Sequence, residues 1–427
     1  MHGAVAHGFV RALSYPKDLT LSIRSSVNQS SDTPNSHFSV QYMRILQTIG
    51  GFGAKGGGTS TCTYDLLSAI HKRSPEPQVD LLTPDLSQPD DRLMGQGEPW
   101  IKVVPNDYRT PLALSKNLTE YLRQSDYDVY HTNGMWMHIN HETCAMARRK
   151  GRPYLITPHG MLYPEALARS AWKKGLMRRL WFDSDIHHAA CIHATCQDEM
   201  NHLRTLGYRG PVALIGNPVA VPPYTAEMIQ DRLHENAPFW GVAFLGRLHP
   251  RKKVEHLLYG AAQAQHKDVT LYIIGKGSDD YEAFLHAEAE RLGIQERVRF
   301  LGFLNGRDKF AQLARIDALF VPSDMENFGM IIPEALIVGT PVMASLGTPW
   351  KALNTERCGW WTDNSPEAIA RVIDDIYSRT PQDLAEMGRR GRDYILRTFA
   401  DEEIARQMML LYSWIAGVAE KPDFVYD

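Results

Sequence analysis

Short apolar runs alternate with longer amphipathic runs from residue 43 almost to the end of the chain, and a turn-rich segment divides the series in two. Such alternation builds parallel sheets covered by helices on both faces. The dividing segment, 216–223, holds three prolines, which lack an N–H donor and cannot continue a helix or a central strand. The sequence therefore predicts an α/β fold of two Rossmann-like, doubly wound parallel-sheet domains. The predicted strands are 43–49, 79–83, 128–131, 153–157 and 189–194, then 240–245, 269–274, 298–301, 317–321 and 341–344, and the predicted helices are 59–73, 110–124, 137–149 and 197–206.

The two ends of the chain depart from this alternation. Residues 24–37 contain a single apolar residue, which cannot offset the entropy of ordering, so 1–42 is predicted to be a disordered extension, with Met43 as a hypothetical natural start. At the other end, Asp401 to Ile415 carries apolar residues at helical spacing. The predicted division is 43–218 for the first domain, 223–398 for the second, and 401–427 for a C-terminal helix that returns to the first.

Charge and cysteine content narrow the class of protein. A net charge of −3 among 427 residues provides no global basic field and argues against a nucleic-acid-coating protein. Five cysteines without a CxxC pair are typical of reduced thiols, and no apolar run is long enough to span a membrane, so a cytoplasmic location is expected. The histidine pairs lack a metal-binding pattern such as HExxH, and no metal site is predicted.

Two glutamates frame the sharpest motif. Glu326 and Glu334 follow the apolar run 318–322, with Gly329 and Pro333 between them. Glycine permits an unusual turn and proline suits a first helical turn, so Glu326 is predicted in a loop and Glu334 on the next helix. The amides of Gly329, Met330 and Ile331 would then be free to bind pyrophosphate oxygens. Taken alone, such a pair is more often a helix-dipole carboxylate and a solvated loop residue than a functional site.

A basic loop follows the strand 241–245. Arg247 and Lys252 are placed at the carboxyl end of that strand, where ligands bind in open α/β sheets, and two cations suit a diphosphate leaving group. A solvated basic loop is the alternative. The next strand ends in Gly275 and Gly277, where a base or ribose could approach the backbone, although such short glycine turns are common.

In this order, the motifs resemble family 4 glycosyltransferases, which are retaining enzymes of the GT-B fold. The resemblance covers about Met43 to Ile415: S-x-x-E-x-F-G at 323–329, the glutamate pair, and G-R-L-x-P-x-K at 246–252. Lys253 departs from the family, which usually has glycine there. In the first domain, Gly58 is similar to the family's double-glycine loop, and His159, after strand 153–157, to its histidine-bearing loop; His131 to Gly134 forms a further candidate loop on the acceptor side.

The resemblance implies an activity and a role for each residue. A sugar would pass from a nucleotide diphosphate donor to an acceptor hydroxyl with retention and without a required metal or cofactor. Arg247, Lys252 and the amides after Gly329 would meet the charge of the diphosphate. Glu326 would contact sugar hydroxyls, Glu334 the ribose and His159 the sugar. The alternatives are a nucleotide-sugar epimerase, a phosphorylase and a catalytically silent nucleotide-sugar-binding member. The glycine loops match neither a Walker sequence nor a full GxGxxG, which disfavours a kinase and an NAD-dependent dehydrogenase.

One segment has a different character. Between residues 148 and 182 nine lysines and arginines accompany one acid, and 170–182 interleaves basic residues with tryptophan and leucine. This pattern suits a helix lying on an anionic bilayer, here the inner face of the plasma membrane, and equally an amphipathic helix whose tryptophans enter the core. The resemblance to bacterial lipopolysaccharide and exopolysaccharide enzymes implies a glycan or lipid-linked acceptor.

Overall fold

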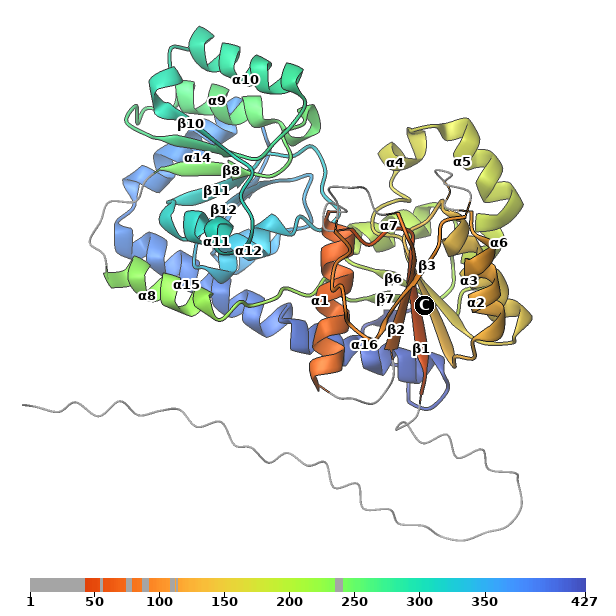
Figure 1. Cartoon of the computed structure of the whole chain (residues 1–427). Helices are drawn as coiled ribbons and strands as arrows, with labels where there is room; N and C mark the ends of the chain where they lie inside the picture. The colour runs from red at the N-terminus through yellow and green to blue at the C-terminus, as the bar shows by residue number, and fades with distance from the viewer. Residues whose placement is uncertain are drawn as a thin grey trace, which may run out of the picture. The chain divides into compact units, whose positions relative to one another are not determined.

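The computed structural model describes residues 43–53, 57–73, 79–86, 92–107, 112, 114–234 and 241–427. The predicted disordered extension 1–42 lies outside the described residues, as do 54–56 of the first glycine loop. Figure 1 shows strands flanked by helices in two sheets.

The first sheet has eight strands in the order β14-β7-β6-β5-β4-β1-β2-β3, and all neighbours are parallel except β14 and β7. The order reverses direction between β1 and β4, which is the topological switch point of a doubly wound sheet. The strands are β1 (Ile45–Ile49), β2 (Val79–Pro84), β3 (Ile101–Val104), β4 (Val129–Asn133), β5 (Tyr154–Thr157), β6 (Cys191–Ala194), β7 (Val212–Leu214) and β14 (Val425–Tyr426). The helices between β1 and β7 are α1 (Gly58–Arg73), α2 (Lys116–Gln124), α3 (His138–Arg149), α4 (Pro164–Ala168), α5 (Ala171–Met177), the π-helix η2 (Arg178–Phe182), α6 (Asp183–His187) and α7 (Gln197–Thr205).

The second sheet has six parallel strands in the order β10-β9-β8-β11-β12-β13, with its switch point between β8 and β11. The strands are β8 (Val242–Leu245), β9 (Leu271–Ile274), β10 (Val298–Gly302), β11 (Ala318–Val321), β12 (Val342–Ser345) and β13 (Gly359–Thr362). The helices are α8 (Tyr224–His234), η3 (Pro250–Lys252), α9 (Val254–Gln263), α10 (Asp279–Arg291), η4 (Gln295–Arg297), α11 (Gly306–Arg315), α12 (Ile331–Ile337), α13 (Ala352–Thr355), α14 (Pro366–Ser378), α15 (Pro381–Thr398) and α16 (Asp401–Ile415).

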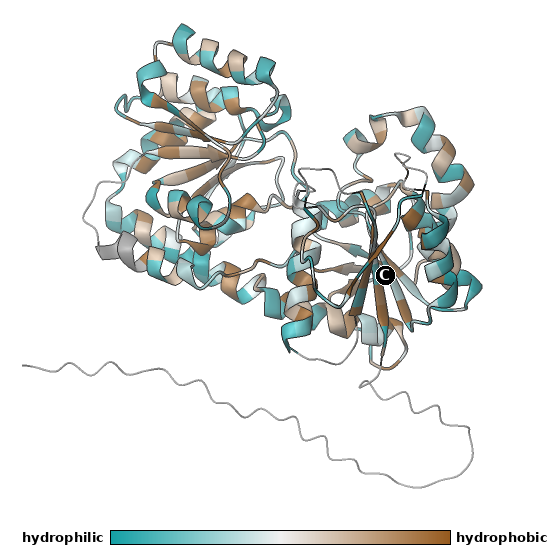
Figure 2. Ribbon diagram, viewed as in Figure 1, coloured by the Kyte–Doolittle hydropathy of each residue, from teal (hydrophilic) through white to brown (hydrophobic). Residues whose placement is uncertain are grey.

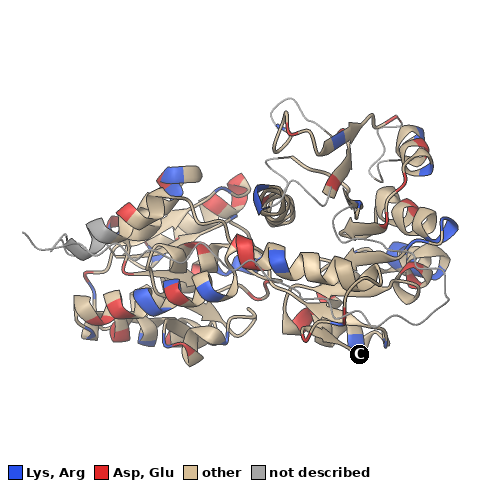
Figure 3. Ribbon diagram, turned by 90° about the horizontal axis from the view of Figure 1, so that it is seen from below, with Lys and Arg blue, Asp and Glu red and all other residues tan. Residues whose placement is uncertain are grey.

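Burial explains why these runs form strands. All five residues of β1 and all four of β11 are buried, as expected for parallel strands covered on both faces. Figure 2 shows hydrophobic residues along the strands and mixed colours along the helices, and Figure 3 places most charges on the helices. The predicted α/β fold of two Rossmann-like sheets is confirmed. The helix predicted at 110–124 begins later, at Lys116, because the Ser115 side chain accepts the Leu118 N–H as an N-cap.

The chain runs from one sheet to the other at 216–223 and returns near residue 400, and these two segments touch. Val219 N–H donates to Phe399 O at 2.8 Å, and a Cβ on Gly216 would lie 2.4 Å from the Phe399 ring. After the return, α16 packs against α1 and buries Ile404, Met408 and Leu411. The final segment therefore joins the core of the first sheet.

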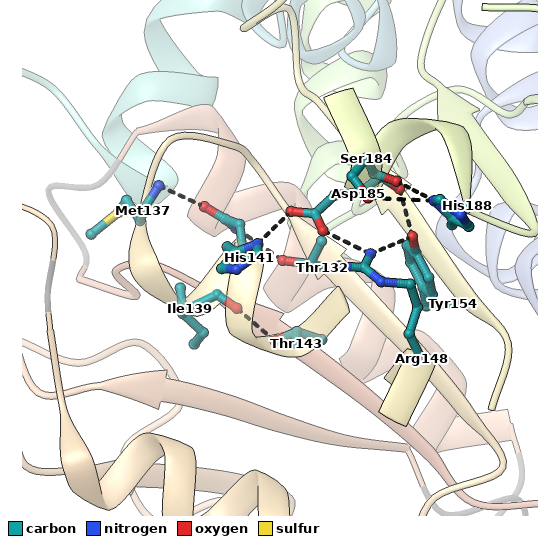
Figure 4. Close-up of polar contacts among 11 residues, drawn as sticks. Thr132, Met137, Ile139, His141, Thr143, Arg148, Tyr154, Ser184, Asp185 and His188 are labelled. Atoms are coloured by element: carbon teal, nitrogen blue, oxygen red, sulfur yellow. Dashed lines mark hydrogen bonds and ion pairs between the residues drawn. The ribbon is translucent and has the colours of Figure 1, made fainter. Parts of the chain in front are cut away.

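A short helical arm, formed by α4, α5, η2 and α6, is anchored by one buried carboxylate. The Asp185 carboxylate forms an ion pair with Arg148 at 2.7 Å and lies 2.8 Å from His141 Nδ1. The Asp185 backbone carbonyl accepts a hydrogen bond from the Tyr154 hydroxyl at 2.6 Å (Figure 4). Arg148 and His141 both lie on α3, so the arm is fixed to the helix layer of the first sheet. Trp172 of this arm is 73% exposed and Trp181 is 42% exposed, so the alternative in which both tryptophans enter the core is wrong.

Candidate active site

A cavity of about 490 Å³ lies where loops from the carboxyl ends of both sheets meet. Gly58 begins the helix after β1, His159 follows β5, Arg247 follows β8 and Glu326 follows β11, so the strands at both switch points contribute. This is where open α/β sheets bind ligands. The lining residues are Gly58, Thr59, Cys62, His159, Gly160, Met161, Tyr163, Ala166, Arg169, Asn217, Arg247, His249, Arg251, Lys252, Met325, Glu326, Asn327, Phe328, Gly329 and Met330.

A second cavity of about 310 Å³ shares a wall with the first, formed by Lys252, Glu326, Gly329 and Met330. It belongs to the second sheet alone, and its other lining residues are Phe244, Leu245, Gly246, Phe303, Leu304, Asn305, Lys309, Val321, Ser323, Ile331 and Glu334. Gly58, His159, Arg247, Lys252, Glu326, Gly329, Met330, Ile331 and Glu334, which the sequence singled out, each line one or both cavities. Gly275, Gly277 and the candidate loop His131 to Gly134 line neither.

Gly275 and Gly277 lie behind the basic loop. Gly275 has φ +147°, and a Cβ there would lie 1.8 Å from Gly246 O; on Gly277 it would lie 2.4 Å from Leu248 O. The backbone that approaches these glycines is thus the protein's own. Leu248 N–H donates to Lys276 O at 2.9 Å, which fixes the loop that carries Arg247. Their contribution to the cavity is to let that loop pack closely.

Lys252 and Glu326 form an ion pair at the wall between the cavities. Ser323 Oγ donates to the same Glu326 oxygen at 2.8 Å, and Glu326 N–H donates to Gly347 O at 2.9 Å. The carboxylate is therefore held by the loop after β11 on one side and by the basic loop on the other. Lys253, the departure from the family pattern, has φ +52° and caps α9. It adopts the left-handed conformation that glycine would adopt there without strain.

Lys309 is a site residue that sequence reasoning missed. Its Nζ lies 2.7 Å from Glu334 Oε1, and both side chains line the smaller cavity. Phe303, 68% exposed, lies at the same cavity and was also missed. Their signals were weak, since one is a charged residue on α11 and the other lies in the loop after β10, and neither belongs to a motif.

His159 has an unusual backbone and a neutral ring. Its φ of +52° is uncommon for a residue with a Cβ and is typical of strained functional positions. The turn is held because Gly160 N–H donates to the buried carboxylate of Glu199, which also accepts the Thr195 N–H at 2.8 Å. Burial, helped by His193, lowers the pKa of His159 to about 3, and its Nε2 lies 3.1 Å from Asn133 Oδ1.

The larger cavity is electropositive. Among the described residues, Arg169, Arg247, Arg251 and Lys252 line it, against one carboxylate, that of Glu326. Burial and then these four cations lower the pKa of His249, which is the response expected of a base in a positive field. Cys62 also lines the cavity, but burial raises the pKa of its thiol to about 12, so it is not a nucleophile at neutral pH.

The described residues were also compared with the requirements of a metal site and of a membrane-spanning helix. Within the described part of the chain, no three His, Cys, Asp or Glu side chains are grouped to hold a metal ion. Among those same residues, no helix combines the length and hydrophobicity needed to cross a bilayer.

Comparison with solved structures shows the fold. HepE of Anabaena, solved in complex with UDP-glucose, superposes with a TM-score of 0.66 at 22% identity and covers 87% of this chain and all of that one. Sucrose-phosphate synthase from Thermosynechococcus elongatus superposes with a TM-score of 0.68 at 21% identity, covering 88% of this chain and all of that one. WaaG, a glycosyltransferase involved in lipopolysaccharide biosynthesis, superposes with a TM-score of 0.59 at 13% identity, covering 87% of this chain and 99% of that one.

Curated relatives match over shorter lengths. The gpi3 subunit of phosphatidylinositol N-acetylglucosaminyltransferase from Schizosaccharomyces pombe is 25% identical over 71% of this chain and 62% of its own length. A D-inositol 3-phosphate glycosyltransferase from Mycobacterium sp. (strain KMS) is 33% identical over 42% of this chain and 46% of its own length. The chain thus spans between about a third and three-fifths of the first relatives it matches.

Family comparison covers both sheets. The family described as "Glycosyl transferase 4-like domain" matches residues 57–218, and the family described as "Glycosyl transferases group 1" matches 227–394. Together the matches span about three-quarters of the chain. The chain belongs to the group 1 glycosyltransferases and has their GT-B fold.

Proposed function

We propose that the chain is a retaining glycosyltransferase that moves a sugar from a nucleoside diphosphate sugar to an acceptor hydroxyl. The observation that carries the proposal is the electropositive cavity of about 490 Å³, which adjoins a second cavity through the Lys252–Glu326 pair. A charged diphosphate fits the shared wall, and a sugar and a nucleoside fit on either side. In this proposal residues 43–218 form the acceptor-side domain and 223–398 the donor-side domain, with 401–427 returning to the first.

The nucleoside would occupy the smaller cavity. Glu334 lies there beside Lys309 and can accept hydrogen bonds from the two ribose hydroxyls. Phe303 offers an exposed aromatic face to a base. HepE of Anabaena was solved with UDP-glucose, which supports a nucleotide sugar as the kind of donor for this fold.

The diphosphate would lie against Arg247 and Lys252. The Ile332 N–H donates to Gly329 O and begins the bonds of α12, so the amides of Gly329, Met330 and Ile331 precede that ladder. Since α12 has only seven residues, we assign the leaving charge chiefly to the two cations, with the amides as additional donors. The charge on the diphosphate grows as the glycosidic bond breaks, so these contacts strengthen toward the transition state and accelerate the reaction.

The sugar would lie in the larger cavity between Glu326 and His159. Because the pKa of His159 is about 3, its ring is neutral at pH 7 and serves as a hydrogen-bonding group rather than as an acid. We propose attack by the acceptor oxygen on the face from which the diphosphate departs. The bond from the anomeric carbon to the phosphate oxygen breaks, the bond to the acceptor oxygen forms, and the acceptor proton passes to the departing phosphate. None of these steps requires a metal ion, and Arg247 and Lys252 supply the positive charge.

Activity on a donor panel tests this function. The purified chain would be incubated with UDP-, GDP- and ADP-sugars, with and without glycan acceptors, and sugar transfer and slow donor hydrolysis would be followed by mass spectrometry. Glu326→Gln and Lys252→Ala should each lower kcat/KM by at least about 10²-fold. Asp324 is a neighbouring carboxylate that lines neither cavity, and Asp324→Asn should retain turnover. Donor epimerisation without an acceptor would indicate the epimerase alternative, and binding without turnover of any donor would indicate the silent one.

We further propose that the acceptor is lipid-linked, as in cell-surface polysaccharide synthesis, and that segment 170–182 of the arm contacts an anionic membrane on its cytoplasmic face. Trp172, Leu176, Leu180 and Trp181 are exposed there, and Lys173 and Arg179 lie exposed between them. Apolar side chains flanked by cations suit the interface of an anionic bilayer. Ala166 and Arg169, which come just before this segment in the chain, line the larger cavity.

Vesicle flotation tests the membrane contact. The chain should float with vesicles that contain phosphatidylglycerol and remain in solution with pure phosphatidylcholine. Trp172→Ser with Leu176→Ser should reduce flotation at least fivefold, about 1 kcal/mol of lost apolar burial. Phe284→Ser, which removes a 40%-exposed aromatic residue from α10, is the matched control. Equal loss in both variants, or no dependence on lipid charge, would contradict the proposal.

A further inference from the structure

A continuous line of buried hydrogen bonds runs from His159, at the larger cavity, through the first sheet. It crosses β4, β1, α16, β5 and β6 and ends at the backbone just before the 216–223 segment. Except for His159, every side chain in it is at most 5% exposed. In order, the members are His159, Asn133, Gln47, Tyr412, His131, Thr157, His193 and the carbonyl of Ile215.

The distances between consecutive members lie in the range of good hydrogen bonds. His193 Nε2 is 2.7 Å from Ile215 O, and Thr157 Oγ1 is 2.8 Å from His193 Nδ1. His131 Nε2 is 2.7 Å from the Thr157 oxygen, and its Nδ1 is 2.7 Å from the Tyr412 hydroxyl. Gln47 Nε2 donates to the Tyr412 hydroxyl at 2.8 Å, and from Gln47 the line continues toward His159.

The carbonyl at one end fixes the direction of every bond. A carbonyl only accepts, so His193 donates from Nε2, and because burial lowers the pKa of His193 to about 4, its Nδ1 must accept from Thr157. The Thr157 hydroxyl has then donated its only proton, so its oxygen accepts a hydrogen bond from His131 Nε2. Burial lowers the pKa of His131 well below its usual value, so its Nδ1 accepts the Tyr412 proton.

The same logic continues to the cavity. The Tyr412 oxygen, having given its proton, accepts from the Gln47 amide, whose carbonyl oxygen then accepts from Asn133 Nδ2 at 2.9 Å. The remaining Asn133 oxygen faces His159 Nε2, which must therefore carry the ring proton. His159 Nδ1 is left with a lone pair and no proton.

We propose that Tyr412 and Gln47 are positioning residues that set the tautomer of His159, so that its Nδ1 is offered to the ligand as a hydrogen-bond acceptor. The inference rests on the proposed function for the nature of that ligand, a sugar hydroxyl of the donor. Tyr412 reaches the site from α16, more than 250 residues after His159, so the C-terminal helix contributes to the active site without touching the substrate.

Tautomer spectroscopy tests the proposal without a substrate. In the full chain labelled with ¹⁵N-histidine, two-bond ¹⁵N–¹H correlation should show His159 as the Nε2–H tautomer, with its signal identified by loss in His159→Asn. Tyr412→Phe removes the hydroxyl and should convert the His159 signal into a mixture of tautomers. Gln47→Met interrupts the line at a second point and should do the same, which keeps the test open if either variant folds poorly.

Tyr208→Phe is the matched control, because it also removes one buried tyrosine hydroxyl bond, to Pro211 O at 3.2 Å, outside the line. It should leave the His159 tautomer unchanged. A wild-type His159 protonated at Nδ1, or one that keeps its tautomer in both Tyr412→Phe and Gln47→Met, would overturn the proposal.

Kinetics adds a second readout. Tyr412→Phe should lower kcat about tenfold, in the range typical of removing a group that orients a functional histidine, and change the donor KM by less than about twofold. The double variant with Gln47→Met should be no slower than the slower single variant, since both interrupt one line. If the two losses in kcat multiplied in the double variant, Tyr412 and Gln47 would not act through one line of hydrogen bonds. A wild-type chain inactive on every donor would refute the proposed function, while the spectra would still decide the tautomer.

Discussion

The two sheets hold their site residues by different means. In the first, the His159 ring lies within hydrogen-bond distance of the buried Asn133 amide, and among the residues that the structure describes no ion pair involves it. In the second, Lys252 and Glu326 are fixed by an ion pair at the cavity wall, where their side chains are 29% and 14% exposed. Buried neutral bonds give direction and rigidity, whereas half-buried charges give a field that can respond to an anion. The comparison indicates that the first sheet positions the sugar and the second neutralises the leaving group.

Removing Lys252 is the strongest way to break this comparison. Lys252→Ala deletes a cation from the wall shared by both cavities and leaves Glu326 without its ion-pair partner, so we expect kcat/KM to fall by about 10²–10³-fold. Steady-state kinetics with the preferred donor would measure it. Lys253→Ala, one residue along the same loop and lining neither cavity, is the control and should stay within about threefold of wild type. Equal losses would assign the effect to loop folding.

Acid pH should expose the buried neutral histidines of the first sheet. Burial lowers the pKa of His159 to about 3 and of His193 to about 4, below that of histidine in the unfolded chain. Between pH 6.5 and 4 the unfolded chain therefore binds more protons, and each such histidine lowers the free energy of unfolding by about 1.4 kcal/mol per pH unit of acidification. Urea unfolding at several pH values would measure the slope, and His193→Gln should flatten it by about one proton.

Asp65 opposes this trend and provides an internal check. Burial, with Glu334 next, raises the pKa of its carboxyl to about 7, above that of the unfolded chain. Its contribution is thus favourable at low pH and is lost as pH rises toward 7. Asp65→Asn should therefore steepen the loss of stability on acidification between pH 6.5 and 4. A slope unchanged in both variants would mean that these groups titrate in the folded chain as they do in the unfolded one.

Added salt should affect the site residues of the two sheets differently. Arg247 is exposed and Lys252 partly exposed, so added salt screens their attraction for a diphosphate. We expect the donor KM to rise roughly fivefold between 50 and 500 mM NaCl. The ratio of wild-type to Tyr412→Phe kcat should stay constant over the same range, because the buried neutral bonds are not screened. A ratio that falls with salt would place charge in the line of bonds to His159.

The smallest effect concerns Lys253. Its φ of +52° costs a residue with a Cβ about 1 kcal/mol, which glycine avoids. Lys253→Gly should therefore stabilise the chain by up to about 1 kcal/mol, partly offset by loss of the 3.5 Å contact between Lys253 Nζ and Asp324 Oδ2. Denaturant unfolding would detect it, and kcat/KM should not change. Destabilisation by more than 1 kcal/mol would show that the contact with Asp324 outweighs the backbone strain.

The sequence predicted the fold well because buried parallel strands are continuous apolar runs. It missed β3, β7, β13 and β14, which are two to four residues long, and in β13 every residue is only partly buried. The short motifs identified site residues that all line the larger cavity, namely Gly58, His159, Arg247, Lys252 and Glu326. Lys309 and the Gln47–Tyr412 bond could not be predicted, because they depend on which side chains of distant elements meet after folding.

The most direct test of the central claim is a crystal structure of the chain with the nucleoside diphosphate that binds it most tightly. The account predicts the diphosphate within hydrogen-bond distance of Arg247 and Lys252, the ribose at Glu334 and the larger cavity open toward His159. A diphosphate bound elsewhere, out of contact with Arg247 and Lys252, would contradict it.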